Sequence, residues 1–296
     1  MRSATQGEKA VLVKELREER YRLNDLLDAI GLSRPTCYYE LGKTDRAKER
    51  NAELSSEIST IFNENRKRYG VRRVHHELLN RGFQVNHKRV QRIMNQLALF
   101  GKRPKEKYHS YKGDVGKAAD NIINRDFSTE KPLQKWTTDV SQFNFPWGGK
   151  CYISSILDMN TNEIISYNLS TSPNMEEIRN MLNKAFERFP FVQGLVMHSD
   201  QGWQYQHAFY RGELQKHGII QSMSRKGNCY DNCIMETFFG RLKNEMFYGF
   251  EKNYHSFEAF SKAIAEYIDY YNNSRIQAKT KWMPPSKFRE ASMMES

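Results

Sequence analysis

The chain has 296 residues, of which 39% are hydrophobic and 12% aromatic, values ordinary for a folded protein with room for two or more domains. No segment approaches the roughly 18 consecutive apolar residues that a membrane-spanning helix needs, and the N-terminus lacks the apolar stretch of a secretory signal. Four cysteines are too few for a disulfide scaffold. The composition therefore favours a cytoplasmic protein with reduced thiols, in which Cys37 and Cys151 serve packing.

The net charge of +11 is concentrated in the N-terminal part of the chain. Residues 1–131 carry 28 Lys and Arg against 18 Asp and Glu, whereas residues 132–296 carry 18 against 17. Residues 66–107 hold 13 basic residues and two acidic ones. One sign of charge gathered in one segment predicts contact with nucleic acid. A solvated basic surface or contact with anionic lipid is the alternative.

The first 44 residues are predicted to form short helices. One helix ends at Gly31, Ser33 is a favoured N-cap, and a second helix runs through Tyr38 and Tyr39. This order of signals is typical of a helix-turn-helix. We therefore predict a helix-turn-helix-like N-terminal region over residues 1–44.

Residues 45–100 are predicted to form a basic, helical DNA-binding segment. Apolar residues at helical spacing run through residues 54–62, a second helix ends at Gly82, and a third begins after Asn86. Basic side chains on such a compact helical unit are suited to gripping DNA phosphates. The candidate DNA-binding residues in this segment are Arg68, Arg72, Arg73, Lys88, Arg89 and Arg92.

The remaining chain divides into a linker, a core and a tail. Residues 101–131 are polar with little periodicity, which indicates a linker. Residues 132–250 read as three strands followed by alternating helices and strands, a pattern that predicts an α/β core with one mixed five-stranded sheet and flanking helices. The last helix of this core is expected over residues 229–246, and residues 251–296 are expected to add a C-terminal helix and tail.

Three carboxylates occupy informative places in the predicted core. Asp139 lies within the first strand, and Asp200 ends a short buried strand at the edge where open α/β sheets present ligands. Glu236 lies among apolar side chains of the last helix, where an ionised carboxylate is costly unless paired or bound to metal. Two adjacent strands and one covering helix can bring the three together. Such oxygen ligands suit Mg2+, and a pair of these ions supports phosphoryl transfer.

The helix that carries Glu236 also presents a basic residue. Glu236, Gly240 and Lys243 share one helical face, which Gly240 leaves open to a polyanion and from which Lys243 could reach a DNA phosphate. A Glu/Lys surface stripe, or a salt bridge from Glu236 to a basic residue, is the alternative. Asp158, followed by Asn and Thr, is predicted to open a turn.

Several sequence blocks resemble the D,D(35)E transposases of the retroviral-integrase superfamily. They are WTTDV around Asp139, HSDQGWQY around Asp200 and SMSRKGNCYDNCIMETFFGRLKNE around Glu236, with 35 residues between the last two acids. The chain is most similar to the OrfB catalytic subunits of the IS-three family of bacterial insertion sequences. RYGVRRVHHELLNRGFQVNHKRVQRIM and the tail YIDYYNNSRIQAKTKWMPPSKF also resemble that family, so the likeness extends over residues 20–290.

The resemblance implies a ribonuclease-H-like core in which Asp139, Asp200 and Glu236 bind two Mg2+, or Mn2+, ions. It implies nicking at the element's end, followed by attack of the freed 3′-OH on another phosphodiester. Lys243 is expected to touch DNA near the scissile phosphate. Ser224, Arg225 and Gly227, on the loop before the catalytic helix, are expected either to shape the approach of DNA or to serve the loop alone.

The family also implies partners and a location. Double-stranded DNA, as element ends and target, would be bound by a homo-oligomer in the bacterial cytoplasm, associated with the nucleoid. No sustained heptad repeat appears in this chain, which therefore looks like the OrfB part alone. The resemblance implies that an upstream-frame OrfA product, fused or separate, helps to recognise the element.

Two departures and two rival functions accompany this reading. Gln277 stands where a His is expected shortly after Arg275, which leaves the role of the tail open. Cys229, Cys233 and His198 could suggest zinc, but no second ligand pair has suitable spacing. The rivals are a metal-dependent nuclease of the same fold, which would cut without joining, and an inactive DNA-binding regulator, which would bind without cutting.

Overall fold

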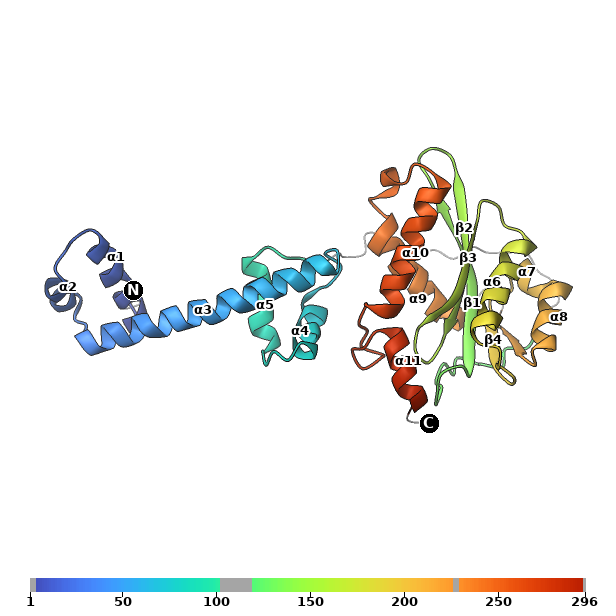
Figure 1. Cartoon of the computed structure of the whole chain (residues 1–296), viewed down its shortest axis with the longest axis horizontal. Helices are drawn as coiled ribbons and strands as arrows, with labels where there is room; N and C mark the ends of the chain where they lie inside the picture. The colour runs from blue at the N-terminus through green and yellow to red at the C-terminus, as the bar shows by residue number, and fades with distance from the viewer. Residues whose placement is uncertain (1–3, 102–118, 226–228, 295–296) are drawn as a thin grey trace. The chain divides into compact units, whose positions relative to one another are not determined.

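The computed structural model describes residues 4–101, 119–225 and 229–294, without the side chains of residues 43–50, 229 and 230 (Figure 1). The chain divides into two compact units, Met1–Gly101 and Lys102–Ser296. Each unit has buried hydrophobic residues of its own. Among the helices in the described ranges, none combines the length and apolar character needed to span a bilayer.

The first unit begins with α1 (Gln6–Glu18), α2 (Leu23–Ile30) and the start of α3 (Arg34–Glu64). Helix α2 ends at Gly31, which adopts the left-handed conformation with φ 66°, as a glycine does readily at a helix C-terminus. The Ser33 hydroxyl accepts a hydrogen bond from the Thr36 N–H at 3.3 Å and so caps α3. The helix-turn-helix signals predicted from the sequence are confirmed.

Helix α3 is continuous over 31 residues, so the predicted boundary between residues 44 and 45 falls inside a helix. Residues 43–50 contain Ala, Lys, Arg and Glu and lack Gly or Pro, so nothing in their composition stops the helix. The end of α3 packs with α4 (Val71–Asn80) and α5 (His87–Gln96). The buried apolar side chains of these three helices include Ile58, Ile61, Phe62, Val74, Leu78, Val90, Ile93 and Met94.

The second unit contains a five-stranded sheet with strand order β3-β2-β1-β4-β5. The first three strands pair antiparallel, whereas β4 pairs parallel to β1, and β5 pairs parallel to β4. This mixed sheet confirms the predicted α/β core. The strands are β1 (Lys135–Asn144), β2 (Lys150–Asp158), β3 (Ile164–Ser170), β4 (Val196–Ser199) and β5 (Ile220–Met223).

Helices cover both faces of the sheet (Figure 1). Trp136 and Ile156 point to one face and pack with α6 (Met175–Arg188), α7 (Trp203–Gln206) and α8 (Ala208–Lys216). Phe143 and Ile153 point to the opposite face and pack with α9 (Cys233–Leu242) and α10 (Phe257–Asn273). Because successive strand side chains alternate between faces, one sheet supplies both cores.

The predicted helix over residues 229–246 is three elements. A 3-10 turn, η1 (Cys229–Asn232), leads into α9, and a π-helix, η2 (Lys243–Phe247), follows it. A second 3-10 turn, η3 (Glu251–Asn253), comes before α10. π-helical turns are rare and occur frequently at functional sites.

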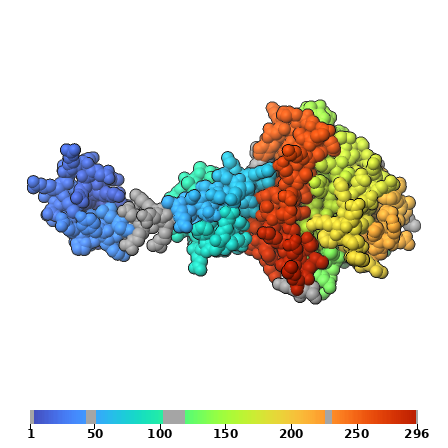
Figure 2. Space-filling model, in the orientation of Figure 1, coloured from blue at the N-terminus to red at the C-terminus, as the bar shows by residue number. Residues whose placement is uncertain are grey.

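The described part of the predicted linker, residues 119–131, and the predicted tail belong to the second unit. The Ile122 N–H donates to the Ser222 hydroxyl at 3.1 Å, which ties the chain before β1 to β5, whereas residues 102–118 lie outside the described residues. Phe260 and Tyr271 of α10 lie in the same core as Phe238 of α9. The chain ends in α11 (Pro285–Met294), and residues 251–294 form a continuous orange-to-red band in Figure 2.

Candidate active site

Asp139 and Asp200 occupy matching positions on neighbouring parallel strands. The register of β1 and β4 pairs Lys135 with Val196 and Thr137 with His198. Two further residues along the same register bring Asp139 opposite Asp200, where β4 ends. Side chains at matching positions of a sheet point to the same face. The two carboxylates therefore lie side by side.

The start of α9 is fastened to the same two strands. The Thr137 hydroxyl donates to the side-chain carbonyl of Asn232 at 2.8 Å. The Nε2 atom of His198 lies 2.9 Å from the Asp231 carbonyl, to which it donates. Thr137 and His198 each stand two residues before an aspartate, so both hydrogen bonds fix the helix over the Asp139–Asp200 pair.

Glu236 faces this pair from the first turn of α9 and is half-buried. Burial raises the pKa of Asp139 well above its usual value, and the negative charges of Asp200 and Glu236 raise it further. The Val140 N–H, at 2.8 Å, and the ammonium of Lys243 oppose this increase. Burial also raises the pKa of Asp200, against a hydrogen bond from the Gly202 N–H at 2.9 Å.

The carboxylates of Asp139, Asp200 and Glu236 are suitable ligands for a hard divalent cation, but they do not form a complete metal-binding site. Within residues 4–101, 119–225 and 229–294, no three His, Cys, Asp or Glu side chains stand close enough together to hold a metal ion. The arrangement is instead an aspartate pair with Glu236 acting on it from the helix. All three groups offer carboxylate oxygens, the ligands that Mg2+ and Mn2+ prefer. The raised pKa of Asp139 reflects its burial first, and then the negative charges of Asp200 and Glu236.

Lys243 lies against the site and is not exposed on the surface. Its ammonium lies 5.1 Å from the centre of the Phe143 ring, and only 9% of the residue is exposed. Burial lowers the pKa of Lys243 to about 8, and the charge of Asp139 opposes that decrease. The predicted contact of Lys243 with a DNA phosphate would therefore occur inside the site.

Asp231, which sequence reasoning missed, organises the chain just before α9. Arg225 donates to its carboxylate from Nε and Nη2, both at 2.9 Å, and Arg125 donates at 3.0 Å. The hydrogen bond and charge of Arg225 hold the pKa of Asp231 well below its usual range. Arg225 was predicted to contact DNA, but in the structure its guanidinium binds Asp231 of the same chain. An acid near the start of the helix expected over residues 229–246 was the signal that the sequence offered.

Two other residues of the loop before η1, Ser224 and Gly227, were also considered for DNA contact. Ser224 is buried, and its N–H donates to the Ser199 carbonyl at 2.8 Å, which extends the contact between β5 and β4. Gly227 lies outside the described residues. The plain loop role is therefore the one that the contacts of Ser224 support.

His198 is not available as a zinc ligand in this arrangement. Its Nε2 is bonded to the Asp231 carbonyl, and its Nδ1 lies 2.9 Å from the Ser222 hydroxyl. Burial lowers the pKa of His198, which favours the neutral ring with its proton on Nε2. Cys233 is half-buried, and the side chain of Cys229 lies outside the described residues.

Two other sequence features have structural roles. The Asp158 carboxylate accepts backbone N–H groups of Asn160 and Thr161 at 3.0 and 2.9 Å, which confirms the predicted turn. Gln277 is 4% exposed, and its side-chain carbonyl accepts from Arg241 at 3.3 Å and from Asn162 at 3.4 Å. The residue that departs from the expected His therefore links α9 to the turn between β2 and β3.

The first unit divides the predicted DNA-binding residues into two sets. Arg72, Lys88 and Arg92 are exposed. The other set is engaged within the unit: Arg89 donates to the Asn51 side chain at 2.8 Å, Arg73 lies 5.7 Å from the Tyr69 ring centre, and Arg68 is 7% exposed. Which of these residues contact DNA stays a prediction.

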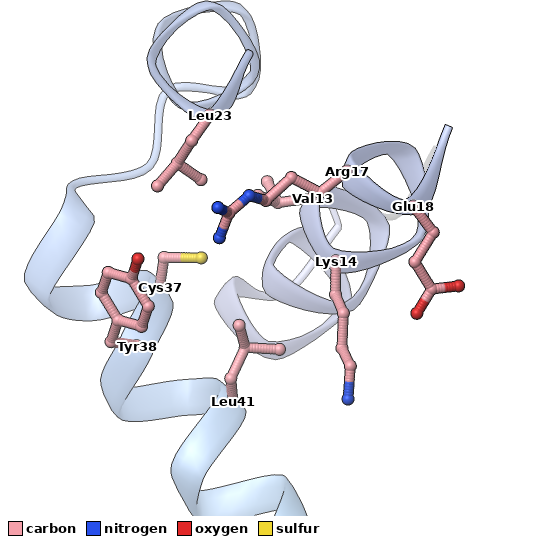
Figure 3. A pocket seen from close by; sticks show the side chains of 8 residues that line it. All are labelled: Val13, Lys14, Arg17, Glu18, Leu23, Cys37, Tyr38 and Leu41. Atoms are coloured by element: carbon pink, nitrogen blue, oxygen red, sulfur yellow. The ribbon is translucent and has the colours of Figure 1, made fainter. Parts of the chain in front are cut away.

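A cavity of about 270 Å3 also lies in the first unit, between α1, α2 and α3 (Figure 3). Arg17 and the thiol of Cys37 point into it, whereas Lys14 and Glu18 point outward. The predicted packing role of Cys37 agrees with its place in the buried cluster of these helices. None of the predicted site residues lines this cavity, whose walls are Val13, Lys14, Arg17, Glu18, Leu23, Cys37, Tyr38 and Leu41.

The family models identify the second unit, with its mixed five-stranded sheet, as an integrase core. The chain matches an integrase core domain over residues 129–229 and a second integrase core domain model over residues 236–293. An HTH-like domain matches residues 48–107.

Three relatives extend these matches along the chain. The chain is 44% identical over 283 residues to the protein named transposase InsK for insertion sequence element IS150 of Escherichia coli K12, which covers 96% of this chain and 98% of that protein. An uncharacterized transposase-like protein of Haemophilus influenzae is 49% identical over 215 residues, 73% of this chain and 98% of that one. The transposase for IS904 of Lactococcus lactis is 31% identical over 80% of this chain and 93% of its own length. The chain belongs to the insertion-sequence transposases of the IS-three family and is of the OrfB type.

Proposed function

We propose that this transposase catalyses metal-dependent DNA cleavage and strand transfer at the ends of its insertion sequence through Asp139, Asp200 and Glu236. The observation that carries the proposal is the matched position of the two aspartates on parallel strands, with Glu236 raising the pKa of Asp139 from α9. These side chains would hold Mg2+, or Mn2+, at two ions per site. When bound, the ions activate the attacking oxygen and stabilise the departing 3′-oxygen.

The chemistry balances as two in-line substitutions at phosphorus. Water attacks a phosphodiester at the element's end, the bond from phosphorus to the 3′-oxygen breaks, and a 3′-OH is released. That 3′-OH then attacks a phosphodiester of the target, where a new phosphorus–oxygen bond forms and another 3′-oxygen leaves. No covalent bond between protein and DNA is required.

The chain's own residues position the acids and receive the DNA. Thr137 and His198 hold α9, and with it Glu236, over the aspartate pair. Lys243 places a positive charge beside Asp139 and contacts the phosphate that enters the site. The exposed cations Arg72, Lys88 and Arg92 contact DNA from the first unit and attract it by their positive charge.

The reaction joins separate DNA segments, so we propose that the transposase acts as a homo-oligomer on element ends and target. An upstream-frame OrfA product, fused or separate, takes part in that assembly. Each of these partners is testable by isolating the complex on labelled element-end DNA.

Cleavage and joining of labelled element-end DNA with Mg2+ test the proposal. Asp200→Asn should abolish both steps while leaving DNA affinity unchanged, because one metal ligand is lost and the basic unit is untouched. Asp269→Asn makes the same chemical change on the exposed surface of α10 and should keep both steps. Residual cleavage by Asp200→Asn would contradict the role assigned. A nuclease would cut without joining, and a regulator would bind without cutting.

A further inference from the structure

One face of α5 is built from polar side chains that solvent reaches. Val90, Ile93 and Met94 are buried, with 2% exposure or less, and they fix the helix on the rest of the unit. The opposite side carries exposed residues at positions i, i+3, i+4, i+7 and i+8, a single helical stripe. These residues are Lys88, Gln91, Arg92, Asn95 and Gln96.

The stripe is not used inside the protein. In the part of the chain that the structure describes, the side chains of Gln91, Arg92 and Asn95 have no hydrogen bond or ion pair. Neighbouring cations behave differently. Arg89 donates to Asn51 on α3 at 2.8 Å, and Arg81 pairs with three glutamates, among them Glu57 at 2.7 Å.

The chemistry of the stripe differs from that of a plain phosphate-binding surface. Phosphate contact requires positive charge, which Lys88 and Arg92 supply. Gln91, Asn95 and Gln96 are uncharged amides that add nothing to that attraction. Asn and Gln form paired hydrogen bonds with adenine, and Arg forms them with guanine, along base edges of the major groove. The mixture of amides and guanidinium therefore indicates base reading.

The helix is also held firmly enough to read a sequence. Its first turn is capped, because the Lys88 N–H donates to the Asn86 side chain at 2.9 Å. The bond from Arg89 to Asn51 ties the same turn to α3. A reading side chain discriminates between bases only if its backbone is fixed.

We propose that α5 is a recognition helix that enters the major groove and reads base pairs through Gln91, Arg92 and Asn95. The transposase thereby carries a sequence preference of its own, in addition to whatever an upstream-frame product supplies. Arg72 on α4 then contacts the backbone, as the first helix of a helix-turn-helix does. The inference rests on the proposed function only in taking the preferred DNA to be the element end.

Selection of preferred duplexes from a randomised pool by the full chain tests this inference, with EDTA present so that no cleavage occurs. The expected result is a defined preferred sequence. Gln91→Ala and Asn95→Ala should each lose the preference at a different position and weaken the preferred site about 10-fold, which corresponds to about 1.4 kcal/mol, within the range for one base contact. Affinity for non-specific DNA and the salt dependence should not change, because neither side chain is charged.

Asn63→Ala, an exposed asparagine on α3, is the matched control and should keep the preference. Unchanged non-specific binding by all three variants shows that they are folded. A pool that yields no preferred sequence, or a preference that survives both α5 substitutions, would overturn the inference. Asp200→Asn should keep the preference, so a failure of catalysis alone counts against the proposed chemistry and leaves the recognition helix standing.

Discussion

The hydroxyl of Thr137 on β1 donates to the side-chain carbonyl of Asn232, immediately before α9, at 2.8 Å. Both residues are buried. Two residues after Thr137 comes Asp139, and four residues after Asn232 comes Glu236. This hydrogen bond between residues 95 positions apart therefore joins two of the three elements that carry proposed metal ligands.

Thr137→Val should reduce both stability and DNA cleavage. The substitution keeps the side-chain shape but leaves a buried carbonyl of Asn232 without its donor, which typically costs about 1–3 kcal/mol. Cleavage should fall because α9 is no longer fixed over Asp139. Thr137→Ser restores the hydroxyl and should recover most of both quantities. Denaturant unfolding measures stability, and the cleavage rate measures activity. Normal cleavage by the valine variant would show that the Thr137–Asn232 bond does not position α9 for catalysis.

Arg275→Ala should strongly destabilise the second unit, Lys102–Ser296, which contains the proposed active site and is called the catalytic unit below. Arg275 is 1% exposed and donates to the Glu245 carboxylate at 3.0 and 2.6 Å. Truncation removes the cation from this acid, whose side chain is 10% exposed and which also accepts from the Tyr267 hydroxyl at 3.1 Å. Breaking such a pair costs about 3–5 kcal/mol. All four tryptophans, Trp136, Trp147, Trp203 and Trp282, lie in this unit, so their fluorescence during denaturation measures it.

Replacing both partners separates the charge from the packing. Arg275→Met combined with Glu245→Met should be clearly more stable than Arg275→Ala, because no buried charge is left uncompensated. A double variant as unstable as the single one would show that the shape of the arginine, and not its charge, supports η2.

The catalytic unit should lose stability as pH rises between about 4.5 and 7. Burial raises the pKa of Glu177 from 4.5 to about 7, so the folded state binds more protons than the unfolded state within this range. The contribution of Glu177 to the free energy of unfolding is fully present below pH 4.5. It declines as pH rises towards about 7 and stays constant above that pH. Each pKa unit corresponds to about 1.4 kcal/mol.

Glu177→Gln should flatten this dependence and stabilise the unit at pH 8, since the amide carries no charge to bury. Tryptophan-monitored urea unfolding at pH 5 and pH 8 measures the effect. The exposed Glu176→Gln is the control on the same helix turn. An equally steep pH dependence in the Glu177 variant would assign the effect to another group.

Arg72→Gln should weaken DNA binding and reduce its salt dependence. Each phosphate contact contributes a slope of about 0.9 in a plot of log affinity against log salt concentration. Arg89→Gln removes the same charge from the same unit, but its guanidinium is bonded to Asn51, so the slope should change less. Equal slopes for both variants would mean that a hydrogen bond within the protein does not distinguish arginines that contact DNA from those that do not.

Much of the architecture was predictable because its signals are local. Alternating apolar residues identified the first strand and short apolar runs the others, and Gly31 and Ser33 marked the end of α2 and the start of α3. The continuity of α3 was not predicted, because a basic, polar stretch reads equally as a loop or as a solvated helix. The π-helix at Lys243 was missed for a similar reason, since its residues fit an α-helix as well.

The sequence by itself determined the kinds of elements and the chemical groups available: three acids in the core and a basic helical segment before it. Residue type and periodicity are properties of short stretches, so they can be read without contacts. Only the tertiary structure decided which groups meet. It set Asp139 beside Asp200, committed Arg225 to Asp231 and Arg89 to Asn51, and left one face of α5 open. These outcomes depend on strand register and side-chain contacts between separate elements, which no local pattern encodes.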